Sequence, residues 1–186
     1  MLRRLTLLSL LLLLSACETR QVERDFDARR DFGAYRSWSW KEPGVQYQPD
    51  DPRIKSDLTE QRIRESINDQ LEQRGLRRAP AGASGELKVQ AWLIVENRQQ
   101  LVSTNYSTGW GPWGGYGYRG MPMASETRSV DYQVSTLQID LFDSKDGKLV
   151  WRGSTERLVS QDNGPNAREA AIRQTVGKIL QQYPPR

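Results

Sequence analysis

Two long segments of alternating apolar and polar residues constrain the fold of this 186-residue chain more than any other feature. Apolar side chains occupy every second position from Leu87 to Val95, and a similar pattern recurs over residues 126–142. Successive side chains in a β-strand point to opposite faces, so alternation places the apolar ones on a single face. The two segments therefore predict long antiparallel strands that bury one face.

The second of these segments changes phase along its length. Its apolar residues fall at even positions up to Val134 and at odd positions from Leu137 onward. A shift of one residue moves side chains to the other face of a strand. We therefore predict a β-bulge near Ser135 and Thr136.

Two further segments have helical periodicity. In the first, the apolar residues recur at every fourth position, as Ile63, Ile67 and Leu71. We predict that Asp57 caps this helix, that Glu60 completes a capping box, and that Gly75 ends it. In the second, Asn166 is the predicted cap with Glu169 at the third position, and Pro184 follows the helix. Its apolar stripe consists of Ile172, Val176, Ile179, Leu180 and Tyr183.

The remaining strands are shorter. Residues 21–26 and 35–40 predict two strands, and the proline-containing stretch 42–56 predicts an irregular surface connection. An Asp-Gly turn at 146–147 leads into a returning strand that begins at Leu149. The order β-β-α-β-β-β-α predicts an α+β two-layer sandwich. We expect a largely antiparallel sheet of about five strands with two amphipathic helices packed on one face. Its core should include Trp38, Trp40 and Trp151.

The N-terminus has the composition of a bacterial lipoprotein signal. Arg3 and Arg4 precede an apolar run over residues 5–14, and Ser15-Ala16-Cys17 follows it. This lipobox predicts cleavage between Ala16 and Cys17 and attachment of acyl chains such as palmitate to Cys17. The apolar run of about ten residues is too short to span a bilayer, which needs about 20. We predict a signal peptide at 1–16 and a single lipoprotein domain at 17–186.

The rest of the N-terminal segment bears on location. A plain signal peptide would leave Cys17, the only cysteine, as a lone thiol in an oxidising compartment. Glu18 is not the aspartate that typically retains lipoproteins in the inner membrane. We therefore expect a protein of the cell envelope, anchored by lipid to the outer membrane and facing the periplasm. Few residues separate Cys17 from the first strand, so the domain should lie close to the membrane surface.

Charge and composition exclude several classes of function. Without Arg3 and Arg4 the 27 basic residues become 25, against 23 acidic ones, and both signs are interspersed. This pattern does not favour a nucleic-acid partner. Histidine is absent and Cys17 is assigned to lipid, which removes His-dependent triads, thiol nucleophiles and the usual zinc ligand sets. We predict no cofactor, no metal and no enzymatic activity.

Carboxylates leave one catalytic alternative open. Asp140, Asp143 and Asp146 are spaced by three, but they match no calcium-binding loop and are typical of a hairpin turn. A peptidoglycan- or glycan-active hydrolase needs only two carboxylates, although nothing in the sequence selects the pair. A structural protein that protects the envelope under stress is the other alternative to a binding or accessory protein.

A glycine-rich segment with interleaved aromatic residues lies between the two long strands. We predict a flexible loop at 105–124, because glycine loses the most entropy on ordering. Trp110, Trp113, Tyr116 and Tyr118 in this loop are candidate contacts for a membrane surface, an envelope protein or peptidoglycan. Alternatively, they fold back over Trp92 and Ile94, the two apolar residues on the outer face of the first long strand.

Three separated motifs resemble a known family. Asp31-Phe32-x-x-Tyr35-x-Ser37-x-x-Trp40 resembles the opening signature of the bacterial lipoproteins grouped as domain of unknown function 4136, in which threonine is usual at the place of Ser37. The segment 147–153, GKLVWRG, and the ending Tyr183-Pro184-Pro185 are also similar to that family. The resemblance covers residues 20–185. It implies an envelope lipoprotein of α+β fold with no established catalytic residues.

Overall fold

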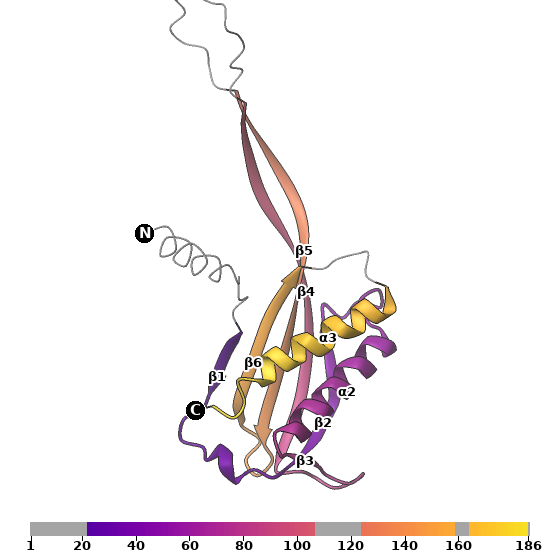
Figure 1. The fold of residues 1–186 in the computed structure, drawn as a ribbon, viewed down its shortest axis with the longest axis vertical. Coiled ribbons are helices and arrows are strands. Elements are labelled where there is room, and N and C mark those ends of the chain that lie inside the picture. The colour runs from indigo at the N-terminus through magenta and orange to yellow at the C-terminus, as the bar shows by residue number, and fades with distance from the viewer. Residues whose placement is uncertain (1–21, 107–123, 159–163, 186) are drawn as a thin grey trace, which may run out of the picture.

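The computed structural model of the chain describes residues 22–106, 124–158 and 164–185. Within them, six strands form one sheet in the order β1-β6-β5-β4-β2-β3 (Figure 1). The strands are β1 (Glu23–Phe26), β2 (Ser37–Gln48), β3 (Arg77–Arg78), β4 (Leu87–Tyr106), β5 (Ala124–Asp143) and β6 (Leu149–Leu158). Three neighbouring pairs are antiparallel, whereas β2 pairs in parallel with both β3 and β4.

Two helices lie side by side on one face of this sheet (Figure 1). They are α2 (Asp57–Gln73) and α3 (Pro165–Leu180), and a single 3-10 turn, η1 (Phe32–Ala34), precedes β2. The helix α2 follows β2 and precedes β3 and β4, so it is the crossover that parallel strands require. The predicted α+β architecture with two helices on one face is confirmed, but the sheet is mixed and has six strands.

The core forms between the sheet and the helices. The apolar alternation in β4 points at the helices, and Leu87, Val89 and Ala91 are fully buried. The predicted helix stripes meet them from the other layer, with Ile63, Ile67 and Leu71 from α2. From α3 the core receives Val176, Ile179 and Leu180, followed by Tyr183. Trp38 and Trp151 are fully buried as predicted, and Trp40 packs edge-on against Trp38, partly buried, at a ring distance of 5.5 Å.

The predicted irregular connection at 42–56 is wrong for its first half. The strand β2 continues through Pro43 to Gln48, with a register shift against β4 between Trp40 and Val45. Past Trp38, β2 has lost its pairing with β3 and lies at the sheet edge, where proline is tolerated. The side-chain amide of Gln90 donates a hydrogen bond to the Pro43 carbonyl at 3.0 Å, which fixes the shifted segment.

Both predicted helix caps are displaced. Ser56, in extended geometry, caps α2 in place of Asp57, and its hydroxyl accepts a hydrogen bond from the Thr59 amide. Gly164 stands at the start of α3 in place of Asn166, because Pro165 takes the first helical position, for which its fixed φ is suited. The predicted end of α2 is confirmed, since Gly75 follows the helix with φ of 83°.

The predicted bulge near Ser135 and Thr136 is also wrong. The pairing of β4 with β5 is continuous from Leu87 opposite Asp143 to Tyr106 opposite Ala124. The register shift in β5 lies instead against β6, between Leu141 and Phe142. The change in apolar phase has another cause. From Leu137 onward the odd face of β5 packs under the helices, whereas the even-numbered Val134 is buried on the opposite face.

The two longest strands extend past the rest of the molecule. Pairing of β2 with β4 ends at Ile94, and pairing of β6 with β5 begins at Val134. Residues 97–106 and 124–133 therefore pair only with each other, and we call this two-stranded segment the ribbon. We call the rest of the sheet together with the helices the body. Figure 1 shows the ribbon projecting beyond both helices.

Candidate functional site

The residues that the sequence nominated as site residues lie outside the described part of the chain. This holds for Ala16 and Cys17 at the lipobox and for the four aromatic residues between β4 and β5, namely Trp110, Trp113, Tyr116 and Tyr118. The structure does place the ends of that segment. Tyr106 and Ala124 pair with each other at the outer end of the ribbon.

The three sequence motifs meet in one aromatic cluster. The ring of Tyr183 lies 5.9 Å from Phe32 and 5.7 Å from Trp151, both edge-on. Phe32 also meets Phe26 edge-on at 6.2 Å. The Trp151 Nε1 and Tyr183 Oη atoms are buried and have no hydrogen-bond partner among the described residues. Burial raises the pKa of Tyr183. The cluster is thus held by ring packing, and the motif residues that form it have a structural role.

A carboxylate network locks the first motif to the β5–β6 turn. One oxygen of Asp143 accepts hydrogen bonds from Arg30 at 3.0 Å and from the Tyr35 hydroxyl at 2.9 Å. Arg30 also pairs with Asp146 at 2.5 Å, and this hydrogen bond lowers the pKa of Asp146. Burial, followed by the contact with Asp143, raises the pKa of Tyr35 to about 12. Asp143 and Asp146 are therefore used for packing the N-terminal segment.

Asp140 is paired with a different arginine. It is buried, and both of its oxygens accept hydrogen bonds from Arg152, at 2.7 Å and 2.8 Å. A glycosidase dyad needs one carboxyl that is protonated and one that is free to attack or to activate water. Asp140, Asp143 and Asp146 are instead each paired with an arginine. Within the described residues, no group of three or more potential ligands is placed to hold a metal ion.

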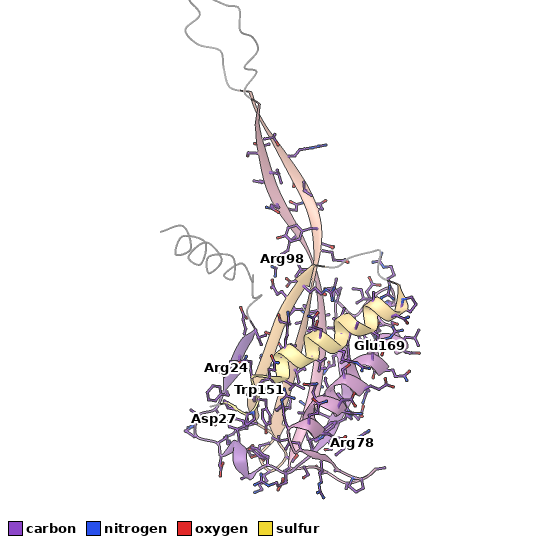
Figure 2. The ribbon with its side chains drawn as sticks, in the orientation of Figure 1. Arg24, Asp27, Arg78, Arg98, Trp151 and Glu169 are labelled. Carbon is purple, nitrogen blue, oxygen red and sulfur yellow. The ribbon has the colours of Figure 1, made fainter. Side chains whose placement is uncertain are left out.

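Exposed apolar side chains lie on both faces of the ribbon, with Leu101 on the odd face and Val102 and Val130 on the even face. Leu101 is 72% exposed and Val130 is 47% exposed, and Val102 is exposed as well. The even face carries Val102, Val130 and Tyr132, which continue the line of Val134 and Ile94 on the outer face of the body. Figure 2 shows Arg98 where the ribbon leaves the body, and there it pairs with Glu96 at 2.9 Å and Glu156 at 2.7 Å. The base of the ribbon is thereby tied to β6, and no described strand or helix covers the apolar side chains farther out.

A cleft lies on the opposite, helix-bearing face of the body. Its volume is about 470 Å³, and it opens between the first turns of α2 and α3 and the upper part of β4, β5 and β6. Apolar side chains line its interior, among them Ile63, Leu137 and Ile172. Arg53, Arg157 and Arg168 also line it, and none of the lining residues in the described part of the chain is acidic. No sequence pattern predicted this site, because its residues come from five separate segments.

The chain matches the family described as domain of unknown function (DUF4136) over residues 22–185. It belongs to this family. The match spans the two helices and the six-stranded sheet described above, and it confirms the resemblance seen in the three motifs. A search of the curated proteins found no match.

Solved structures agree on the fold. A DUF4136 family protein from Bacteroides thetaiotaomicron has a TM-score of 0.50 at 19% identity, with 90% of this chain and 97% of that chain covered. A PDZ domain protein from Parabacteroides distasonis has a TM-score of 0.51 at 16% identity, with 89% of this chain covered. The alignment spans only 35% of that longer protein. A minor lipoprotein from Acinetobacter baumannii matches at 14% identity, 80% and 88% coverage and a TM-score of 0.29.

The family match and the first two structures establish the fold and leave the activity of the family open. The helices of the described residues include none that is long and apolar enough to cross a membrane. Sequence reasoning located the segment between the long strands but missed the length of the ribbon. A signal was present, because the apolar alternation of β4 stops at Val95 while Val102, Thr104 and Tyr106 farther on are residue types that favour strands.

Proposed function

We propose that this protein is a lipid-anchored lipoprotein of the cell envelope that binds a partner through the ribbon and has no catalytic activity. Its anchor is the acylated Cys17, and its place is the periplasmic face of the outer membrane. The lipobox supports the anchor, and Glu18 supports the outer membrane. The partner is another envelope protein or peptidoglycan.

The observation that carries the binding role is the exposure of apolar side chains on the ribbon. A two-stranded ribbon is marginally stable in water, and apolar side chains on it gain nothing from exposure. Leu101, Val102 and Val130 nevertheless project from it without cover by any described residue. The ribbon also presents two free strand edges, whose backbone groups are available to pair with a partner strand.

The ion pairs of the acidic residues support the absence of catalysis. The three regularly spaced aspartates, Asp140, Asp143 and Asp146, are bound to Arg30 and Arg152. The motifs that identify the family form the aromatic cluster and its network, so the family signature describes a scaffold. What the scaffold carries is the ribbon, with the segment 107–123 connecting its two strands.

The anchor and the ribbon also have separate roles at different places in the chain. The first strand begins at Glu23, so only residues 18–22 lie between the acylated cysteine and the sheet. A short tether keeps the body close to the bilayer surface, while the ribbon extends the reach of the protein away from the helices (Figure 1). A partner-binding role uses both features, because the anchor sets the location and the ribbon makes the contact.

Photo-crosslinking in intact cells tests this function. A photoreactive amino acid at Leu101 should give a discrete adduct with an envelope protein or with peptidoglycan fragments. The matched control is Leu58, which is also exposed, at 62%, but lies on α2 of the body. Replacement of Trp110, Trp113, Tyr116 and Tyr118 by alanine should weaken the adduct at Leu101. If both leucine positions gave the same pattern of adducts, the ribbon would not be the binding surface.

A further inference from the structure

We propose that the cleft between the helix N-termini and the sheet binds a single-chain anionic lipid, such as a long-chain fatty acid. The acyl chain would lie along the apolar interior, and the charged head would lie among the arginines. This site is on the helix-bearing face of the body, away from the ribbon. The proposal therefore stands whether or not the ribbon binds a partner.

The interior of the cleft suits a hydrocarbon chain. Ile63 from α2, Leu93 from β4 and Leu137 from β5 line it from three elements, and Ile172 adds a side chain from α3. Ile63 and Leu137 are buried in the core, so the apolar surface of the cleft continues the core of the body. Burial of hydrocarbon on such a surface is favourable in proportion to the area that leaves water.

The described residues of the lining carry positive charges only. These come from Arg53, Arg157 and Arg168. Arg53 already pairs with Asp51 at 2.6 Å, and this hydrogen bond lowers the pKa of Asp51 to about 2. Arg157 differs, since within the described residues it forms no ion pair. It follows Gly153 and Thr155 at every second position of β6, on the face that the helices cover. Arg157 is therefore the cation best placed to receive a carboxylate.

Backbone dipoles add to this positive character. The helices α2 and α3 run in the same direction, because their first turns share the cleft while Arg74 after α2 donates to the Leu180 carbonyl at the end of α3. Two positive helix ends are thus brought together at the cleft. Gly164 provides no side-chain cap for α3, and no other side chain among the described residues caps the amides of its first turn, a position that favours an anion.

Size and charge select the occupant. A volume of about 470 Å³ falls in the usual range of small-ligand sites, about 300–1,000 Å³, and suits one chain better than a two-chain phospholipid. A neutral lipid would leave Arg157 without a counter-charge, and this applies to the diacylglyceryl group predicted on Cys17. A small inorganic anion would leave the apolar interior empty. A lipid with one acyl chain and an anionic head matches both the apolar interior of the cleft and its arginines.

Native mass spectrometry of the lipidated protein, purified in a non-ionic detergent, tests the proposal with three probes. Palmitate has the chain and the charge, hexadecanol has the same chain without the charge, and acetate has the charge alone. We expect one palmitate per protein, at least about tenfold tighter than hexadecanol, which corresponds to one lost charge-assisted contact. Acetate should not bind in the same concentration range.

Two matched variants locate the binding. Arg157→Gln should weaken palmitate binding about tenfold and leave hexadecanol binding unchanged. Arg173→Gln is the control, because Arg173 lies on α3 outside the cleft and pairs with Glu169. It should not change either affinity. A cleft-filling variant, Ala171→Trp, should abolish binding of both long-chain probes if circular dichroism shows it to be folded.

Several results would overturn the proposal. Equal binding of palmitate and hexadecanol would mean that the arginines do not select an anion. Equal loss in Arg157→Gln and Arg173→Gln would place the lipid elsewhere on the surface. No palmitate adduct at any concentration below micelle formation would remove the site altogether. None of these results bears on the crosslinking at Leu101, so failure here is distinguishable from failure of the proposed binding role.

Discussion

The strands β4 and β5 run through both the body and the ribbon, but the two regions differ in almost everything else. Leu87 and Leu101 both belong to β4 and point to the same face, yet Leu87 is fully buried and Leu101 is 72% exposed. The difference comes from what lies above the strand, since α2 and α3 cover only the body. Alternation along a strand therefore does not reveal whether its apolar face is core or contact surface.

The body is further held by contacts between residues far apart in the sequence. Phe32, Trp151 and Tyr183 come from three different motifs and meet within one cluster. In the ribbon each residue pairs with the strand beside it, and Arg98 at the base adds ion pairs with Glu96 and Glu156. The comparison assigns stability to the body and partner binding to the ribbon, and the following variants test that assignment.

Trp151→Ala should produce the largest loss of stability. The side chain is fully buried and contacts Tyr183, and truncation of a buried tryptophan costs about 3–5 kcal/mol. Denaturant unfolding measures the loss. Trp92→Ala on the outer face of β4 is the control and should cost clearly less, because that side chain is only partly buried. Similar losses in the two variants would contradict the role of the aromatic cluster.

Asp143→Asn should cost less, about 1–3 kcal/mol. The variant keeps the shape of the side chain but removes the charge that Arg30 and the Tyr35 hydroxyl contact. Asp131→Asn is the matched control, since Asp131 lies on the same strand in the ribbon and is exposed. It should change the free energy of unfolding by less than about 0.5 kcal/mol. The two aspartates thus compare body and ribbon within β5.

Tyr35→Phe should alter the alkaline limb of the stability profile. The pKa of Tyr35 is raised from 10.0 to about 12 in the folded protein, so the folded state holds its proton where the unfolded state has lost it. The resulting stabilisation is complete below about pH 10 and is lost as the pH rises to about 12. Denaturant unfolding at a series of pH values should show a shallower alkaline decline in Tyr35→Phe. An unchanged slope would mean that Tyr35 is not buried against Asp143.

The sequence predicted the layers of the body well because periodicity reports burial directly. Ile63, Ile67 and Leu71 lie in the core, as their spacing required. Proline was less informative. Pro43 indicated an irregular segment, but the edge position of β2 and the hydrogen bond from Gln90 allow the strand to continue past it. Such compensation depends on a neighbouring strand and is not visible in local sequence.

The candidate sites were less predictable for a physical reason. The cleft draws Arg157 from β6 and Arg168 from α3, and no short motif links residues that only the fold brings together. The phase change of the apolar residues in β5 was visible in the sequence, but its structural cause was not. It marks where helix cover ends, and sequence alone assigned it to a bulge. The end of helix cover over a strand and a β-bulge in that strand produce the same change of phase in its apolar residues.

Leu101→Ala is expected to have the smallest effect on stability. Removal of an exposed apolar side chain from an uncovered strand leaves no cavity, so the free energy of unfolding should change by less than about 0.5 kcal/mol. Leu87→Ala on the same strand is the control and should cost about 2–5 kcal/mol, because it opens a cavity beneath the helices. The ribbon variant should instead reduce the yield of crosslinks from a photoreactive residue at Ser129, which pairs with Leu101 and points to the same face. A large loss of stability in Leu101→Ala would show that Leu101 is covered in the folded protein, and a stable variant with undiminished crosslinking would place the contact elsewhere.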